Sequence, residues 1–167
     1  MRQERSSAEV VGADVPDAFP FRLVSRRLKA VLNSLGPELP GLAAKGTTNL
    51  AYMHPDDLAE VGLADDDLIE ITSPRASMRG VVGAAPDVRR GVISMAHSWG
   101  GTSLTDEKVR DIGSPTARLI ATDRAFDPVT GMVVMSAIPV RVNPVDEHTE
   151  VLGRTAAPGS PGRARRR

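Results

Sequence analysis

One segment of the chain gathers side chains that can bind an anion. It contains Ser25, Arg26, Arg27, Asn33 and Ser34. A guanidinium presents a planar fork of N–H donors that matches phosphate or carboxylate, and amide and hydroxyl groups donate to phosphate or carbonyl oxygens. Each charge-assisted hydrogen bond to an anion contributes about 1.5–3 kcal/mol where water is excluded. The same residues also fit an ordinary basic turn with solvated arginines, so both interpretations stay open.

A second polar segment contains the only tryptophan of the chain, Trp99, directly after His97 and Ser98 and before two glycines. Glycines let a backbone approach a flat ligand closely, and an indole can cover such a ligand. The imidazole and the hydroxyl add hydrogen-bonding groups. A core tryptophan beside a flexible turn has the same pattern, and this alternative also stays open.

The sequence contains no motif of a self-contained catalytic site. It has no GxGxxG loop, no Walker lysine loop and no GxSxG elbow. The histidines, His54, His97 and His148, are far apart and lack metal-ligand spacing. The absence of cysteine excludes thiolate zinc sites, iron–sulfur clusters held by the chain and a cysteine nucleophile. The pattern therefore favours a binding role.

Short β-branched strands are the main elements expected to position the two polar segments. Alternation of apolar and polar residues predicts strands at residues 21–25, 68–72, 78–82, 91–95 and 137–142. Residues 73–77 contain a proline and predict a hairpin connection. Each polar segment follows a predicted strand directly.

Helical signals are few. Pro55 suits the first position of a short helix, His54 suits its cap, and Gly62 suits a left-handed end. A second short helix is predicted within residues 105–112, closed by Gly113. Many short strands with few short helices and long Gly/Pro-rich connections predict a mainly β protein with short helices, most simply a small β-barrel.

The length of 167 residues predicts one domain with two tails. Residues 1–18 lack a sustained period and are expected to form a flexible lead-in. Residues 19–145 are expected to form the β-barrel domain. Residues 146–167 are rich in Pro, Gly, Ser and Arg and are expected to form a disordered basic tail, because such a composition cannot bury enough apolar area to offset chain entropy.

The charge balance excludes some partners. The chain has 21 basic and 21 acidic side chains, so it has no long-range attraction to nucleic acid or to an anionic membrane. Aromatic residues make up only 3 %, too few for a platform that stacks single-stranded bases. No apolar run approaches the ~18–20 residues that span a bilayer, and no secretory signal is visible. We therefore expect a cytoplasmic protein.

The chain resembles the C-terminal molybdopterin dinucleotide-binding domain of the molybdenum oxidoreductases, the superfamily of dimethyl sulfoxide reductase, formate dehydrogenase and nitrate reductase. Four blocks occur in the family's order: an S/T-R-R…N-S element, an N/H-P-x-D segment, an H-G-W-G loop and a closing segment. In this chain they lie at residues 25–34, 49–63, 90–100 and 113–142. Ser98 stands where the family's loop usually has glycine.

This resemblance implies a double-psi β-barrel that binds a molybdopterin guanine dinucleotide cofactor (Mo-bis-MGD), with molybdenum or tungsten as its metal. It implies that the cofactor is shared with other domains or with a partner chain, and that this chain supplies no metal ligand. The residues that the resemblance assigns to cofactor binding are Ser25, Arg26, Arg27, Asn33 and Ser34 on one side, His97, Ser98 and Trp99 on the other, and Arg118.

The resemblance also implies a partner. In the family, the metal-binding side chain, the iron–sulfur motif and the substrate funnel belong to other domains. The chain is therefore expected to be the C-terminal domain or a split subunit of an oxidoreductase. It would work with a larger catalytic molybdoenzyme chain and would not be catalytic in isolation.

Two other functions fit a small barrel of this kind. An enzyme of the aspartate decarboxylase type forms its pyruvoyl group by cleaving at Gly-Ser, and Gly113 with Ser114 offers such a pair, followed by Pro115. A protein-interaction or substrate-adaptor module, as in some chaperone ATPases, would bind a protein partner without a cofactor.

Overall fold

The computed structural model describes residues 17–29, 31, 39–43, 48–100, 108–123, 126–127 and 129–145. The predicted tail and all but the last two residues of the predicted lead-in lie outside these residues. The domain limits expected from the sequence therefore stay predictions.

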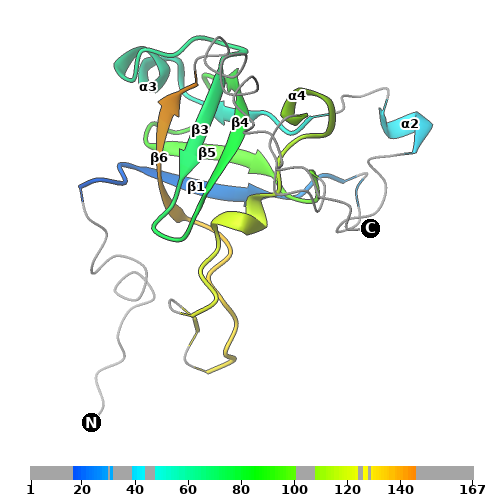
Figure 1. Cartoon of the computed structure of the whole chain (residues 1–167), viewed down its shortest axis with the longest axis vertical. Helices are drawn as coiled ribbons and strands as arrows, with labels where there is room; N and C mark the ends of the chain where they lie inside the picture. Colours follow the sequence, from blue (N-terminus) through cyan, green and yellow to red (C-terminus); the bar gives the residue numbers. More distant parts are fainter. Residues whose placement is uncertain are drawn as a thin grey trace, which may run out of the picture.

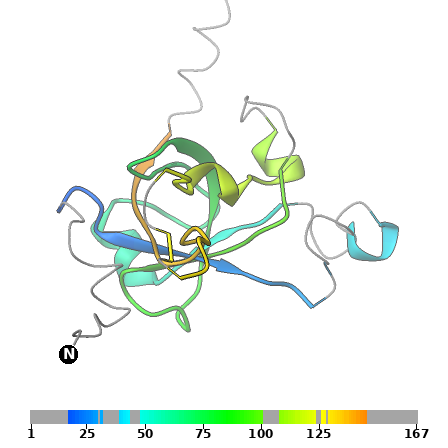
Figure 2. The same cartoon turned by 90° about the horizontal axis from the view of Figure 1, so that it is seen from below.

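Six strands in the described part of the chain form a closed barrel (Figure 1, Figure 2). In chain order they are β1 Phe21–Arg26, β2 Ala51–Met53, β3 Leu68–Thr72, β4 Ser77–Ala84, β5 Val92–Ala96 and β6 Ile138–Pro144. The short helices are α2 Pro40–Ala43, α3 Pro55–Glu60 and α4 Val109–Ile112, and Thr116–Leu119 forms a 3₁₀ turn, η1.

The order of strands around the barrel is β1, β5, β2, β4, β3 and β6. Two neighbouring pairs are parallel, β1 with β5 and β2 with β4, and the other pairs are antiparallel. Closure leaves no strand with a free edge, which is how small β-proteins avoid edge-to-edge association. The predicted fold class, a mainly β double-psi barrel with short helices, is confirmed.

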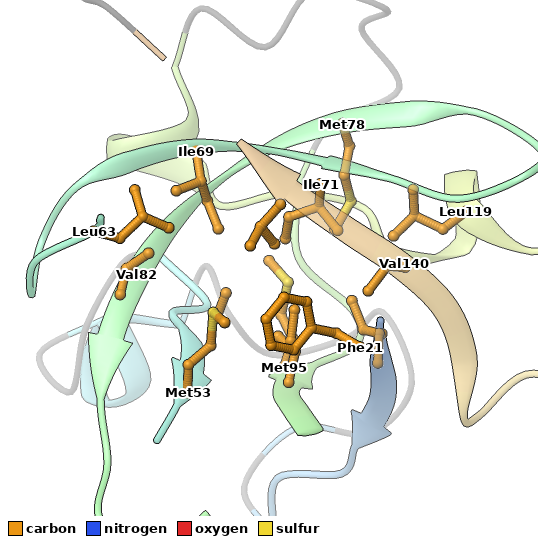
Figure 3. Close-up of a cluster of buried hydrophobic side chains, with 14 of the residues drawn as sticks. Phe21, Met53, Leu63, Ile69, Ile71, Met78, Val82, Met95, Leu119 and Val140 are labelled. Carbon is orange, nitrogen blue, oxygen red and sulfur yellow. The ribbon is translucent and has the colours of Figure 1, made fainter. Parts of the chain in front are cut away.

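The core consists mainly of aliphatic and methionine side chains that alternate along the strands and point into the barrel (Figure 3). Burial of each such side chain stabilises the fold by about 1.5–3 kcal/mol. The members that are completely buried are Leu23, Ala51, Met53, Ile69, Ile71, Ile93, Met95 and Val140. Strands from both halves of the chain contribute, so the barrel is one cooperative unit.

All five predicted strands are confirmed, with ends no more than two residues from those predicted, but β2 was missed. Its three residues, Ala51–Met53, include no β-branched side chain and are too few to show alternation. The helix that begins at Pro55 is confirmed, as are the cap by His54 and the left-handed Gly62, at φ +70°. The second helix is shorter than predicted: α4 covers Val109–Ile112 and ends at Gly113, while residues 105–107 lie outside the described part.

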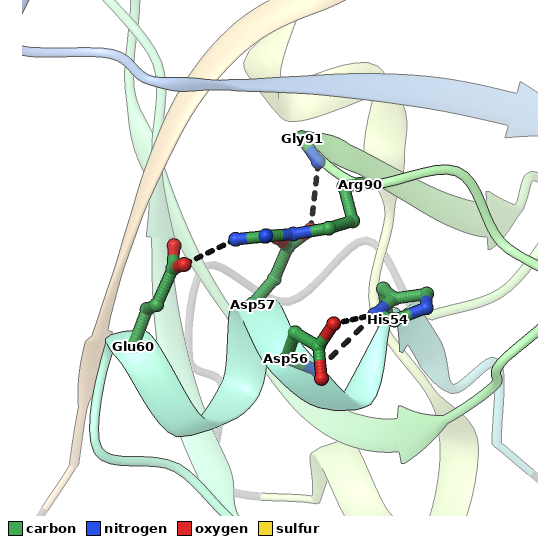
Figure 4. A network of polar contacts seen from close by, with 6 residues as sticks. All are labelled: His54, Asp56, Asp57, Glu60, Arg90 and Gly91. Carbon is green, nitrogen blue, oxygen red and sulfur yellow. Dashed lines mark hydrogen bonds and ion pairs between the residues drawn. The ribbon is translucent and has the colours of Figure 1, made fainter.

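A buried carboxylate anchors the start of β5 (Figure 4). Asp57 of α3, 3 % exposed, accepts hydrogen bonds from the Arg90 Nε at 3.0 Å and from the Gly91 backbone N–H at 2.7 Å. The Gly91 carbonyl in turn accepts from the Arg22 N–H at 2.9 Å. Asp57 therefore aligns β5 against β1, and this alignment positions the segments that follow both strands.

Asp57 also affects the pKa of Arg90. Its hydrogen bond, together with the ion pair between Arg90 and Glu60, raises the pKa of the Arg90 guanidinium above its usual value.

Among the helices that the structure describes, none is long and apolar enough to cross a membrane.

Candidate functional site

The two polar segments meet where β1 and β5 end. These strands run parallel, with Ser25 opposite Met95 and Arg26 opposite Ala96. The first residue after β5 continues the pairing, because the His97 N–H donates to the Arg26 carbonyl at 3.1 Å. Parallel neighbours end at the same edge of a sheet, so residues that are far apart in sequence form one polar edge of the barrel.

Three buried polar atoms at this edge have no hydrogen-bond partner within the described residues: Ser25 Oγ, Arg26 Nε and Trp99 Nε1. They are the only buried side-chain nitrogen or oxygen atoms of the described part in this state, and all belong to residues that the sequence indicated. Each can donate a hydrogen bond. A buried polar group without a partner costs about 1–3 kcal/mol, so a ligand that accepts these bonds would recover that energy.

The site lies on both faces of the β1 end. Successive side chains of a strand point to opposite faces. Ser25 shares the face of Leu23, whose side chain is buried in the core. Arg26 lies on the opposite face, where its guanidinium carbon is 5.1 Å from the centre of the Tyr52 ring. The donors of Ser25 and Arg26 therefore lie on opposite faces of the barrel wall.

The loop after β5 has an unusual backbone. Ser98 has φ +77°, in the left-handed region that favours glycine, and its Oγ is hydrogen-bonded to His97 Nδ1. Gly100 has φ +80°, and its N–H donates to the Ile112 carbonyl at 2.9 Å. A Cβ at Gly100 would lie only 2.6 Å from Pro115 Cδ. The loop is thus packed closely against the segment that follows α4 at Gly100, while the positive φ of Ser98 is the conformation that favours glycine at that position.

Asn49 is a positioning residue that sequence reasoning missed. It is 3 % exposed and donates from Nδ2 to the Ala96 carbonyl at 2.6 Å and to the Ser114 carbonyl at 3.0 Å. Its Oδ1 accepts from the Ser114 N–H at 2.8 Å. A Cβ at Gly113, which has φ +73°, would lie 2.4 Å from this oxygen and 3.0 Å from Trp99 Cβ. Asn49 thereby joins the end of β5 to the segment behind the Trp99 loop.

A signal for Asn49 existed in the sequence. It opens the second block of the family pattern, and it is a polar residue directly before an apolar run. Its partners lie far along the chain, so only the fold reveals the contacts.

The other predicted site residues are placed less closely together. Arg27 follows β1 directly and is exposed. Arg118 is half-buried in η1, and its N–H donates to the Pro115 carbonyl at 3.0 Å, so it lies one turn beyond the residue that packs against Gly100. Asn33 and Ser34 lie outside the described residues. The structure thus brings together Ser25, Arg26, Arg27 and the His97–Ser98–Trp99 loop, while Arg118 lies in η1.

No group of three or more potential metal ligands of the His, Cys, Asp or Glu type occurs within the described residues. The edge itself presents hydrogen-bond donors and guanidinium charge. Groups of this kind can bind an anion or a carbonyl-bearing heterocycle.

Comparisons with known proteins agree with this fold. The chain is similar in structure to acetylene hydratase from Pelobacter acetylenicus, with a TM-score of 0.63 and 17 % sequence identity. The likeness covers 75 % of this chain and 18 % of acetylene hydratase, so the chain spans less than a fifth of that protein. No curated protein matches the sequence. The sequence pattern of the molybdopterin dinucleotide binding domain matches residues 21–139, from the start of β1 into β6 and across both polar segments. The chain belongs to the molybdopterin dinucleotide binding domain family.

Proposed function

We propose that the chain binds the pterin guanine dinucleotide of a molybdenum or tungsten cofactor, as the C-terminal domain or a split subunit of an oxidoreductase. The observation that carries this proposal is the set of three buried donors without a partner in the described part of the chain, Ser25 Oγ, Arg26 Nε and Trp99 Nε1. Membership of the family supports a dinucleotide as the ligand.

The donor set fits the chemistry of a dinucleotide. A pyrophosphate offers anionic oxygens, which the Arg26 guanidinium binds through its planar N–H groups. A flat heterocycle offers carbonyl oxygens and ring nitrogens, which accept from a hydroxyl or from an indole N–H. In this proposal Ser25, Arg26 and Trp99 donate directly to the cofactor.

The remaining predicted residues complete the proposed site. Arg27 adds positive charge beside Arg26, and His97 and Ser98 add hydrogen-bonding groups on the loop. Asn33, Ser34 and Arg118 are included on the resemblance to the family. The bound cofactor would supply redox chemistry through its metal, while this chain would bind and orient the dinucleotide without a metal ligand.

A larger partner chain is part of the proposal. The chain spans 18 % of acetylene hydratase, which supports a role as one domain of a larger assembly. The segment before β6 also exposes large apolar side chains. These are Phe126, Val129, Met132 and Met135, with Val129 90 % exposed. Exposed apolar side chains gathered on one segment are typical of contact surfaces, here with the chain that carries the metal-binding and iron–sulfur domains.

Calorimetric titration of the full chain with guanosine diphosphate tests the proposal. Arg26→Ala removes one charge-assisted donor and is expected to weaken binding by about 1.5–3 kcal/mol, or about 10- to 100-fold. Arg89→Ala is the control, because Arg89 is exposed and precedes β5 at the opposite end of the strand. Equal affinities of the parent chain and Arg26→Ala would contradict the assignment, and a parent chain that binds no guanine nucleotide would contradict the function.

A further inference from the structure

Arg26 reaches across a neighbouring strand to an aromatic ring. Its guanidinium carbon lies 5.1 Å from the centre of the Tyr52 ring, although β5 lies between β1 and β2 in the barrel. Arg26 is opposite Ala96 on β5, and Tyr52 is opposite Ser94 on the same strand. These two small residues let the long side chain of Arg26 lie across β5.

The Tyr52 ring packs closely against Gly83. The two residues are direct partners in the parallel pair of β2 and β4. A Cβ at Gly83 would lie 2.7 Å from Tyr52 Cδ1, 2.8 Å from Cε1 and 3.2 Å from Leu50 Cβ. Real Cβ atoms do not approach so closely, so any larger residue would displace the ring. The glycine is required here by space, because its φ lies outside the left-handed region.

A cation over a ring face keeps its hydrogen-bonding capacity. The attraction acts on the face of the guanidinium plane, while the N–H groups point outward in that plane. Arg26 Nε is buried and has no partner in the described part of the chain, so this donor is oriented without being used. The ring thus supplies orientation that a solvated arginine would lack.

We propose that Tyr52 is a positioning residue that holds the Arg26 guanidinium ready for an anionic phosphate group, with Gly83 as the residue that lets the ring lie in place. This inference rests on the proposed function, and it adds two residues that the sequence analysis did not assign to the site. Pre-orientation reduces the entropy that Arg26 loses on binding, so the effect of Tyr52 is expected in the affinity for a phosphate-bearing ligand.

Matched variants separate the ring from its surroundings. Tyr52→Phe keeps the ring, Tyr52→Leu keeps an apolar side chain without a ring face, and Gly83→Ala displaces the ring. Gly41→Ala is the control, because a Cβ at Gly41 would meet nothing within 4 Å and its φ also lies outside the left-handed region. The probes are guanosine diphosphate and inorganic pyrophosphate, titrated by calorimetry against the full chain.

The expected effects follow from the strength of a cation–π contact. Tyr52→Leu and Gly83→Ala are expected to weaken binding of both probes by about fivefold, and Tyr52→Phe by less than about twofold. Gly41→Ala should bind like the parent chain. In an Arg26→Ala background, Tyr52→Leu should have no further effect, because its role acts through Arg26.

A second measurement needs no ligand. The ¹⁵N-edited NMR signal of the Arg26 Nε–H group should show a ring-current shift in the parent chain and in Tyr52→Phe, and this shift should be absent in Tyr52→Leu. Unchanged affinity in Tyr52→Leu, or an equal loss with and without Arg26, would overturn the positioning role while leaving the proposed function intact. If the parent chain shows the shift but binds neither probe, the proposed function itself fails. If Gly83→Ala does not fold, the comparison of Tyr52→Leu with Tyr52→Phe still tests the positioning role.

Discussion

The His97 backbone N–H donates to the Arg26 carbonyl oxygen at 3.1 Å, at the point where β1 and β5 end. This one hydrogen bond joins two polar segments that lie far apart in the sequence. It also places the loop that contains Trp99 beside Arg26 and Arg27. A ligand that accepts hydrogen bonds from both segments could therefore bind at one edge of the barrel. The following predictions concern residues that stabilise this edge, the loop after β5, the start of β5 and the turn before β6.

Asn49 is expected to be essential for stability. Asn49→Ala removes three hydrogen bonds and leaves buried backbone groups of Ala96 and Ser114 without partners. We expect a loss of about 2–4 kcal/mol in the free energy of unfolding, measured by urea denaturation. Asn143→Ala is the control, because Asn143 is an exposed asparagine of β6 and should change stability by less than about 0.5 kcal/mol. Equal stability of the two variants would refute the role of Asn49.

Ser98→Gly is expected to stabilise the protein. A residue with a side chain is strained at φ +77°, whereas glycine adopts this conformation freely. The gain should be about 0.5–1 kcal/mol after the loss of the hydrogen bond to His97, measured by thermal or urea unfolding. The same change at Ser94, inside strand β5, should destabilise. A destabilised Ser98→Gly would show that the hydroxyl contributes more than the strain costs.

Asp57 is expected to matter more than its ionic partner. Asp57→Ala removes acceptors from both Arg90 and the Gly91 N–H, and should cost about 2–4 kcal/mol in unfolding free energy. Arg90→Ala leaves the bond to Gly91 in place and removes a half-exposed side chain, so it should cost clearly less than Asp57→Ala. Urea unfolding of both variants checks the order. A larger loss in Arg90→Ala would show that the charge, and not the backbone anchor, holds β5.

The turn before β6 is expected to weaken in acid. Hydrogen bonds from the Thr130 N–H, the Thr130 hydroxyl and the Val129 N–H hold the pKa of Asp127 below its usual value. A lowered pKa in the folded state means that this contribution is present above the unfolded pKa, about 3.9, and is lost as the pH falls through the folded value.

An NMR titration of the Asp127 carboxyl group measures this shift. Thr130→Val removes the hydroxyl donor and should raise the pKa of Asp127, and it should lower stability at neutral pH more than in acid. Thr130→Ser keeps a hydroxyl and should retain most of the shift. An unchanged pKa in Thr130→Val would show that the backbone donors alone set it.

Much of the local structure could be predicted from the sequence. Residues 68–72 form a strand with the predicted limits, because alternation and β-branching agree there. Pro55 and Gly62 mark the helix and its left-handed end because each has a strong backbone preference. Such signals are local, so no knowledge of the barrel was needed.

The parts that could not be predicted depend on pairing across the barrel. Asn49 and Asp57 form hydrogen bonds with residues far along the chain, and Tyr52 lies against Gly83. Only closure of the barrel brings these residues close together. The sequence identified Arg26 and Trp99 by residue type and by resemblance to the family. It could not show that Arg26 Nε and Trp99 Nε1 are buried and have no partner among the described residues, since that depends on how the fold covers them.

The pairing of β1 with β5 has a consequence for the order of events during biogenesis. Three other strands lie between these two in the sequence, so their contact is non-local and cannot form until β5 has been synthesised. The donors of the site are then brought together only after most of the domain has been synthesised and has closed. A ligand that needs all of these donors would bind only the folded chain. At free concentrations above its Kd, it would raise the melting temperature in proportion to the logarithm of its concentration. Measuring the shift in melting temperature with candidate nucleotides is therefore a direct way to search for the ligand.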